Sequence, residues 1–168
     1  MPSPLRLCVR RSPASGGSGA ATLVTLRLPS EVECIEEAVE LVTRHCLAGH
    51  DAPHKTRFRL QVVLSEALSN AIMRGNREDR GKWVHIRAEL GPEVIQLVVT
   101  DEGPGFDPAA VPEPIRPEQL DEANGRGLYL IRKLVDEVSF NEQGNSICMT
   151  LRRPTDGAVS CRWSSLAR

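Results

Sequence analysis

The chain has 168 residues, with 21 basic and 22 acidic side chains and a formal net charge of -1, so it can form one domain with a sizeable core and needs no disulfide or metal. The near balance of charge predicts no direct nucleic-acid partner and no anionic membrane partner, and no apolar run approaches the ~18 residues of a membrane span. Five cysteines without framework or CxxC spacing, and a start without an apolar signal core, indicate a cytoplasmic protein.

The first predicted elements are a flexible segment, a strand and a helix. Residues 1–20 are rich in Pro, Ser, Gly and Arg, a composition that favours a flexible lead. Residues 21–29 alternate apolar and polar side chains, which predicts a strand. Ser30 and Glu33 have the spacing of a capping box, so we expect a helix that runs from here to about Ala48.

A second helix is predicted from about His54 to Arg74. Its apolar side chains recur at i, i+4, i+7 and i+11 and form one stripe, made of Leu60, Leu64, Ala67 and Ala71. Glu66 and Asn70 lie four positions apart, so they project together beside this stripe. The pair has two interpretations: an exposed acid with a hydrated amide, or an acid and an amide that act together.

The remaining elements are two strands, a long loop, a helix and two short strands. Residues 82–90 and 93–101 are strand-like, and Gly91–Pro92 between them predicts a turn. Residues 102–124 are rich in proline and predict a long loop, after which 125–138 have helical periodicity. The strand-like runs on either side of Gly144 close the predicted domain.

This order groups the helices instead of alternating them with every strand. It predicts an α+β fold, a two-layer α/β sandwich in which three helices cover one face of a mixed, largely antiparallel sheet. The domain is expected to span residues 21–153, and residues 154–168 are expected to form a C-terminal tail.

Two glycine-rich segments are candidates for ligand contacts. Asp101 ends a predicted strand and is followed by Gly103 and Gly105. This segment forms either an ordinary turn or a place where a ligand approaches the backbone. Gly125 and Gly127 precede a helix, where main-chain N–H groups either bind phosphate or only give a flexible helix entry. No GxxxxGK[ST] and no strand–GxGxxG–helix pattern occurs, which disfavours the Walker and Rossmann sites.

Together, E-x-x-x-N, D-x-G-x-G-F and G-x-G-L, in this order, resemble the GHKL or Bergerat-fold ATP-binding domain of DNA gyrase, Hsp90, histidine kinases and MutL. Within that superfamily, "LSEALSNAI", "DEGPGFDP" and "GRGLYLIRKLVDEVSF" look like the bacterial anti-sigma-factor serine/threonine kinases. The resemblance covers residues 22 to about 152. It implies the Bergerat fold, with ATP and Mg²⁺ as cofactors.

The resemblance also implies roles for the paired residues of the second helix. Asn70 would be the metal ligand, holding Mg²⁺ through its carboxamide oxygen. Glu66 would be the catalytic general base that takes the proton of a serine or threonine hydroxyl. One departure from the family pattern is Arg74, which stands where relatives commonly have a histidine, and this puts any contact of that histidine in doubt.

The other implied contacts are with the nucleotide. Asp101 would accept the adenine amino hydrogen, and Ser146 would bond adenine through water. The base would pass close to the main chain of the D-x-G-x-G-F segment, at Gly103, Gly105 and Phe106. The G-x-G-L segment would close on the phosphates through Gly125, Arg126, Gly127 and Leu128, with Arg126 reaching the γ-phosphate.

The implied function is that of a protein serine/threonine kinase acting as an anti-sigma regulatory factor. It would phosphorylate a STAS-domain anti-anti-sigma protein, sequester a sigma factor and form a homodimer, as family members tend to do. Two alternatives are a nucleotide-gated protein-binding switch with little catalysis and a detached histidine-kinase-type ATPase domain. Glu66 argues against the switch, which needs no base, and the absence of a helical hairpin with a phosphoacceptor histidine argues against the other.

Overall fold

One antiparallel sheet is formed by the strands of the described residues, which are 5–12, 21–48, 53–91, 93–110 and 126–152 of the computed structural model. Its strand order is β1-β2-β3-β4-β6-β5, and every pairing among the described strands is antiparallel. The six strands are β1 (Arg6–Ser12), β2 (Ala21–Pro29), β3 (Trp83–Leu90), β4 (Val94–Asp101), β5 (Glu137–Phe140) and β6 (Ser146–Arg152).

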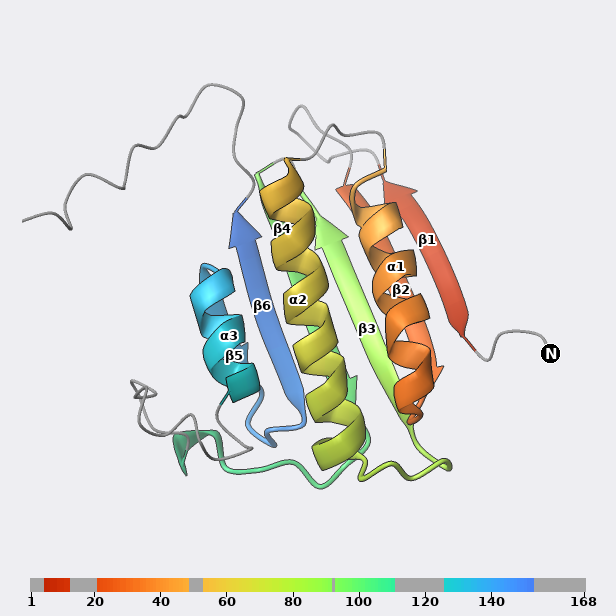
Figure 1. The fold of residues 1–168 in the computed structure, drawn as a ribbon, viewed down its shortest axis with the longest axis vertical. Coiled ribbons are helices and arrows are strands. Elements are labelled where there is room, and N and C mark those ends of the chain that lie inside the picture. Colours follow the sequence, from red (N-terminus) through yellow and green to blue (C-terminus); the bar gives the residue numbers. More distant parts are fainter. Residues whose placement is uncertain (1–4, 13–20, 49–52, 92, 111–125, 153–168) are drawn as a thin grey trace, which may run out of the picture.

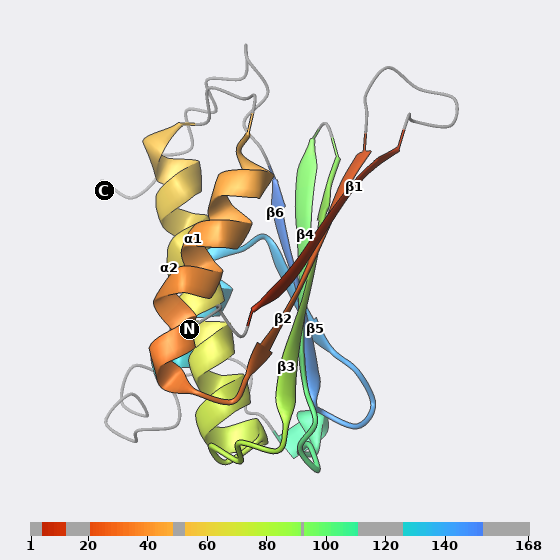
Figure 2. The same cartoon turned by 90° about the vertical axis from the view of Figure 1, so that its right-hand side faces the viewer.

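The helices lie on one face of this sheet (Figure 1), and Figure 2 shows no described helix on the opposite face. The α-helices of the described ranges are α1 (Ile35–Cys46), α2 (His54–Asn70) and α3 (Arg126–Leu134). Shorter turns are the 3₁₀ turns η1 (Val32–Cys34) and η3 (Pro108–Ala110) and the π turn η2 (Ala71–Gly75). This arrangement confirms the predicted two-layer α+β fold. None of the described helices is long and apolar enough to cross a membrane.

The core lies between the helices and the sheet. The predicted stripe of α2 is buried, and alternate residues of the central strands face it: Val24, Leu26, Leu28, Val84, Ile86, Ala88, Ile95, Leu97 and Val99. Burying one Leu, Ile or Val side chain contributes about 1.5–3 kcal/mol, so this layer fixes α2 firmly against the sheet. Glu66 and Asn70 are half-buried at the edge of the same helix.

Strand β1 corrects the predicted flexible lead of residues 1–20 at Arg6–Ser12. Residues 1–4 and 13–20 lie outside the described residues. Residues Arg6–Ser12 pair with β2 along their whole length, from Arg6 opposite Arg27 to Ser12 opposite Ala21. Leu5, Leu7 and Val9 are partly buried against the core. Composition was a poor guide here because alternate apolar side chains, even only three of them, can be buried once a neighbouring strand is available.

The predicted capping box at Ser30 is also wrong. The residue before the first turn is Glu31, which makes no side-chain capping bond, and the α-helix begins only at Ile35. The Ser30 hydroxyl instead donates to the Lys82 carbonyl at 3.0 Å and accepts from Asn76 at 2.7 Å. Because Ser30 is buried, its hydroxyl bonds to the groups packed around it and not to the local N–H groups.

Arg59 joins α2 to the end of α3. Its Nε donates to the Leu134 carbonyl at 2.5 Å, and its Nη2 lies 3.0 Å from Asp136 Oδ2. The Asp136 carboxylate also accepts from the Arg152 main chain at 2.8 Å. The Arg59 side chain is only 19% exposed, so these contacts are less screened by solvent than those of a surface pair.

Replacing Arg59 with methionine is therefore expected to lower the free energy of unfolding by about 1.5–3 kcal/mol, the usual contribution of hydrogen bonds to charged groups. Urea unfolding monitored by circular dichroism measures the change. Arg152→Met is the matched control, because its ion pair with Glu137 is 3.8 Å long and about 70% exposed. The control should cost about 0.5 kcal/mol or less, and equal losses in the two variants would contradict this role of Arg59.

Candidate functional site

Glu66 and Asn70 lie on the edge of α2 that meets the first turn of α3. A Cβ atom on Gly127 would lie 2.6 Å from Glu66 Oε2 and 3.4 Å from Asn70 Nδ2. Glycine at position 127 therefore leaves this space to the ends of the two side chains, and a methyl group there would displace the flexible end of Glu66. Among the described residues, none forms a hydrogen bond with either side chain. The carboxylate and the carboxamide thus keep their hydrogen-bonding capacity for another molecule.

The first turn of α3 adds main-chain donors and one cation. The first N–H groups of an α-helix have no partner within the helix, and they favour anions. Arg126, the first described residue of α3, is exposed, and Leu128 is half-buried. Gly125, predicted for the same segment, lies outside the described residues. This end of α3 therefore suits phosphate oxygens.

Asp101 ends β4 and is partly buried. Its main-chain N–H donates to the Asn145 carbonyl at 2.9 Å, and Asn145 Nδ2 returns a bond to the Asp101 carbonyl at 3.2 Å. The carboxylate accepts the Gly103 N–H at 2.8 Å. Burial raises the pKa of Asp101, while the Gly103 N–H and the Lys82 ammonium oppose this rise. The result is a fixed hydrogen-bond acceptor at the end of the strand.

Glycines allow the end of η2 to lie directly against this turn. A Cβ atom on Gly75 would collide with the Asp101 carboxyl group, and one on Gly103 would collide with the Gly75 carbonyl. The Gly75 position and the D-x-G segment, far apart in the sequence, are therefore in direct contact. This contact places the segment that follows α2 beside the Asp101 carboxylate.

Gly105 continues the D-x-G-x-G-F segment with a φ of +75°, in the region that favours glycine. A Cβ atom there would collide with the Gln143 carbonyl. The next ring, Phe106, stands edge-on to Phe140 with 5.2 Å between centroids, and Phe106 remains 44% exposed. The segment therefore offers both a close main chain and an accessible aromatic surface.

The sequence motifs thus form two neighbouring groups: the acid–amide pair with α3, and the Asp101 turn with the end of η2. A family model, described as the histidine kinase-like ATPase domain, matches residues 28–151. The chain belongs to this family. The match confirms the recognition of a GHKL-type ATP-binding domain from the three motifs.

Relatives of this histidine kinase-like ATPase domain include two proteins named serine-protein kinase RsbW. The Bacillus subtilis (strain 168) protein is 34% identical over 99 residues, which cover 54% of this chain and 61% of that relative. The Staphylococcus aureus (strain JH9) protein is 27% identical over 135 residues, covering 76% of this chain and 84% of the relative. The chain therefore spans less than two-thirds of the Bacillus protein and most of the Staphylococcus one.

In this ATPase domain Ser146 lies opposite Thr100, the residue before Asp101, but its side chain points away from the Asp101 carboxylate. The Ser146 hydroxyl lies 2.7 Å from Thr100 Oγ1, and Thr100 lines a hollow on the sheet face without described helices. Asn145 is the residue beside Asp101. The alternation of side chains along a strand could have predicted this orientation. Ile147 packs on the core, so its neighbour Ser146 points to the opposite face of the sheet.

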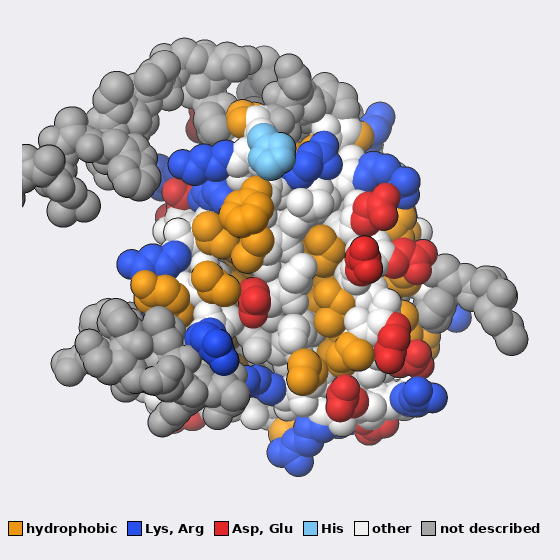
Figure 3. Space-filling view, in the orientation of Figure 1, with side chains coloured by type: hydrophobic (Ala, Val, Ile, Leu, Met, Phe, Trp, Pro, Cys, Tyr) orange, Lys and Arg blue, Asp and Glu red, His pale blue; other side chains and the backbone are white. Residues whose placement is uncertain are grey.

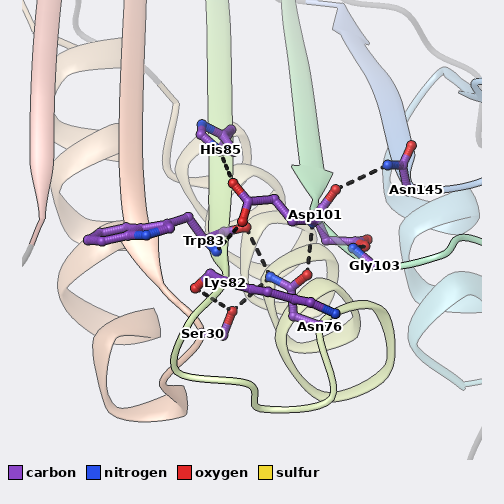
Figure 4. A network of polar contacts seen from close by, with 9 residues as sticks. Ser30, Asn76, Lys82, Trp83, His85, Asp101, Gly103 and Asn145 are labelled. Atoms are coloured by element: carbon purple, nitrogen blue, oxygen red, sulfur yellow. Dashed lines mark hydrogen bonds and ion pairs between the residues drawn. The ribbon is translucent and has the colours of Figure 1, made fainter.

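Asn76 is a buried residue of the ATPase domain that was not among the predicted site residues. It is 1% exposed and sits at the centre of the polar network in Figure 4. Its carboxamide bonds to Ser30, Trp83 and Glu102. An isolated Gly-Asn after a helix gives no sign of such a network, because two of its partners, Ser30 and Glu102, are 46 and 26 positions away.

Proposed function

We propose that the protein is an ATP-dependent protein serine/threonine kinase that acts as an anti-sigma regulatory factor. The observation that supports this most directly is the meeting of Glu66 and Asn70 with Gly127 at the start of α3. A base, a hard oxygen ligand and phosphate-binding main chain are gathered there. The relatives named serine-protein kinase support the same choice.

The Asp101 turn is the proposed adenine site. The Asp101 carboxylate accepts a hydrogen from the adenine amino group, whereas guanine presents a carbonyl oxygen that a carboxylate cannot pair with. Gly103 and Gly105 let this segment pack against the Gly75 and Gln143 main chain, and the exposed ring of Phe106 offers an apolar surface to the base. Asn145, beside Asp101, takes the place in this proposal that Ser146 had in the sequence prediction.

Mg²⁺ fits the donor set of the acid–amide edge. The Asn70 carboxamide supplies a hard oxygen, and no hydrogen bond from a described residue occupies it. Mg²⁺ is commonly held by one or two protein oxygens, with substrate phosphates and waters as the other ligands, so one amide suffices. When bound, the ion supplies positive charge against the phosphate oxygens. Asn70 is the residue that would hold it.

Glu66 is the proposed general base. Its carboxylate takes the proton of the partner's serine or threonine hydroxyl as that oxygen attacks the γ-phosphorus and the bond to the β-phosphate bridging oxygen breaks. ADP leaves with the bridging oxygen, and the partner's hydroxyl oxygen keeps the phosphoryl group. The start of α3, with Arg126, Gly127 and Leu128, binds the phosphate oxygens through main-chain N–H groups and the Arg126 guanidinium. The proposal keeps Gly125, which precedes α3 in the sequence, as a further phosphate contact.

The proposed protein partners are a STAS-domain anti-anti-sigma protein, which receives the phosphoryl group, and a sigma factor, which is sequestered. On the helix face, hydrophobic side chains reach the surface between charged ones (Figure 3). Exposed hydrophobic residues of α2, η2 and α3 are Phe58, Met73 and Leu130. Such side chains supply apolar contact area to a protein partner. A homodimer in the cytoplasm completes the proposal.

Replacing Asp101 with asparagine is expected to weaken ATP binding by about 10–100-fold, since a hydrogen bond to a charged acceptor contributes about 1.5–3 kcal/mol. Asp107→Asn is the matched control, because Asp107 is exposed in the following loop, and it should leave the affinity unchanged. Isothermal titration calorimetry measures both variants. Equal affinities for the Asp101 variant and the wild type would remove Asp101 from the base site.

The same residue predicts a pH dependence. The carboxylate form of Asp101, which predominates above its pKa, can accept a hydrogen bond at each oxygen. In the protonated form one oxygen carries a hydrogen and acts as a donor instead. Because burial raises this pKa above its ordinary value of 3.8, wild-type affinity should start to fall at a higher pH than an ordinary aspartate would cause. Asp101→Asn shares any titration of the nucleotide, so the difference between the two pH profiles isolates this group.

The kinase proposal is tested by incubating the purified protein with γ-labelled ATP, Mg²⁺ and a lysate of the organism that encodes it, followed by identification of the labelled protein and residue. Label on a serine or threonine of a small STAS-domain protein is the expected result. Tight ATP binding without transfer to any protein would favour the nucleotide-gated switch instead. Label on a histidine would favour a histidine-kinase-type domain.

A further inference from the structure

Asn76 connects three segments that are far apart in the sequence. Its Nδ2 donates to Ser30 Oγ at 2.7 Å and to the Trp83 carbonyl at 2.9 Å, and its Oδ1 accepts the Glu102 main-chain N–H at 2.8 Å. These partners lie after β2, at the start of β3 and directly after β4 (Figure 4). One buried side chain thus ties the turn after β4 to the rest of the domain.

This bond acts where the sheet no longer holds the chain. The pairing of β4 with β3 ends at Asp101 opposite Val84, and the N–H of the next residue, Glu102, donates to Asn76. The Glu102 carboxylate in turn accepts the Trp83 N–H at 3.0 Å and lies 3.2 Å from His85 Nε2. Asn76 therefore continues the ladder by one residue beyond the strand.

The same side chain also fixes what touches the Asp101 carboxylate. Gly75, the residue before Asn76, lies against that carboxyl group, and Gly103, two residues after Asp101, donates its N–H to it. The two residues that the bond from Glu102 to Asn76 joins are the chain neighbours of those contacts: Asn76 follows Gly75, and Glu102 precedes Gly103. A change in this bond would therefore move the Asp101 carboxylate relative to both neighbours.

We propose that Asn76 is a positioning residue for nucleotide selection: through the Glu102 N–H it fixes the angle at which the Asp101 carboxylate meets the base. This inference rests on the proposed adenine site. A side chain that only stabilised the fold would change the amount of folded protein and would leave the preference between two nucleotides unchanged. The ratio of ATP to GTP affinity therefore separates the two roles, since any unfolded fraction weakens both affinities equally.

The test compares Asn76→Ala, Ser30→Ala and the wild type, with dissociation constants for ATP and GTP measured on each protein. Ser30→Ala removes one partner of Asn76 and leaves the bond to Glu102, so it is the matched control. Asn76→Ala is expected to lower the ATP-over-GTP preference by about tenfold. Ser30→Ala should lose stability but keep the preference within about twofold.

Each outcome has a separate meaning. Wild-type protein that binds neither nucleotide would overturn the proposed function, whereas wild-type selectivity that persists in Asn76→Ala would overturn this inference alone. If Asn76→Ala does not fold, amide hydrogen exchange in the wild type decides. Slow exchange at Glu102, slowed further by ATP but not by GTP, supports the role, and exchange as fast as in an open loop contradicts it.

Discussion

Replacing Glu66 with glutamine is expected to lower the rate of phosphoryl transfer by about 10²–10⁴-fold, the usual contribution of a general base, while ATP still binds. Glutamine keeps the size of the side chain and its place against Gly127 but cannot take a proton. Single-turnover transfer of labelled phosphate, measured alongside ATP affinity, separates the chemical step from binding.

Glu40→Gln is the matched control for this change. Glu40 is an exposed residue of α1, so the same loss of one negative charge there should leave the transfer rate unchanged. Transfer at the wild-type rate by Glu66→Gln would show that Glu66 is not the base. Loss of ATP binding in the Glu66→Gln variant would instead assign the Glu66 carboxylate a role in nucleotide binding.

Asn70→Ala should lose the part of ATP affinity that depends on Mg²⁺. We expect a fall of about 100-fold or more, because even outer-shell partners of metal ligands commonly cost about 10–100-fold. In the presence of EDTA, the variant and the wild type should bind ATP with similar affinity, since the amide then has no ion to hold. Titrations with and without Mg²⁺ measure both quantities.

Gln61→Ala controls for the loss of a carboxamide from α2. Gln61 lies nine positions before Asn70 and so about half a turn around the helix, away from the Glu66 edge. The Gln61→Ala variant and the wild type should show the same dependence of ATP affinity on Mg²⁺. An Asn70→Ala protein that keeps full Mg²⁺-dependent affinity would disprove the metal-ligand role.

Periodicity alone predicted the layer that carries the proposed site. The stripe of α2 is buried as expected, and the four-residue spacing of Glu66 and Asn70 puts both on one edge, because a helix has a fixed geometry over such a short distance. At Gly103 and Gly105 the main chain does pass close to its neighbours, which are the Gly75 and Gln143 main chain. A ligand at these glycines, and phosphate binding at Gly127, stay predictions.

The missed features are those that depend on a neighbour from elsewhere in the chain. Ser30 looked like a cap because Glu33 follows it at the right spacing, but its partner Asn76 is 46 positions away. Ser146 was chosen by its place in a motif, although the face that a strand residue occupies depends on which neighbour enters the core. Local patterns do not contain this information.

Strand β1 has a consequence for how the domain is handled as an isolated protein. It covers the side of β2 that faces away from β3, so β2 is not at the edge of the sheet. A shortened chain that began at residue 21 would keep the whole proposed nucleotide site but leave unpaired the main-chain N–H and C=O groups of β2 that face β1. Such an open strand is a template for pairing with other chains, so aggregation of that fragment would say nothing against the site itself.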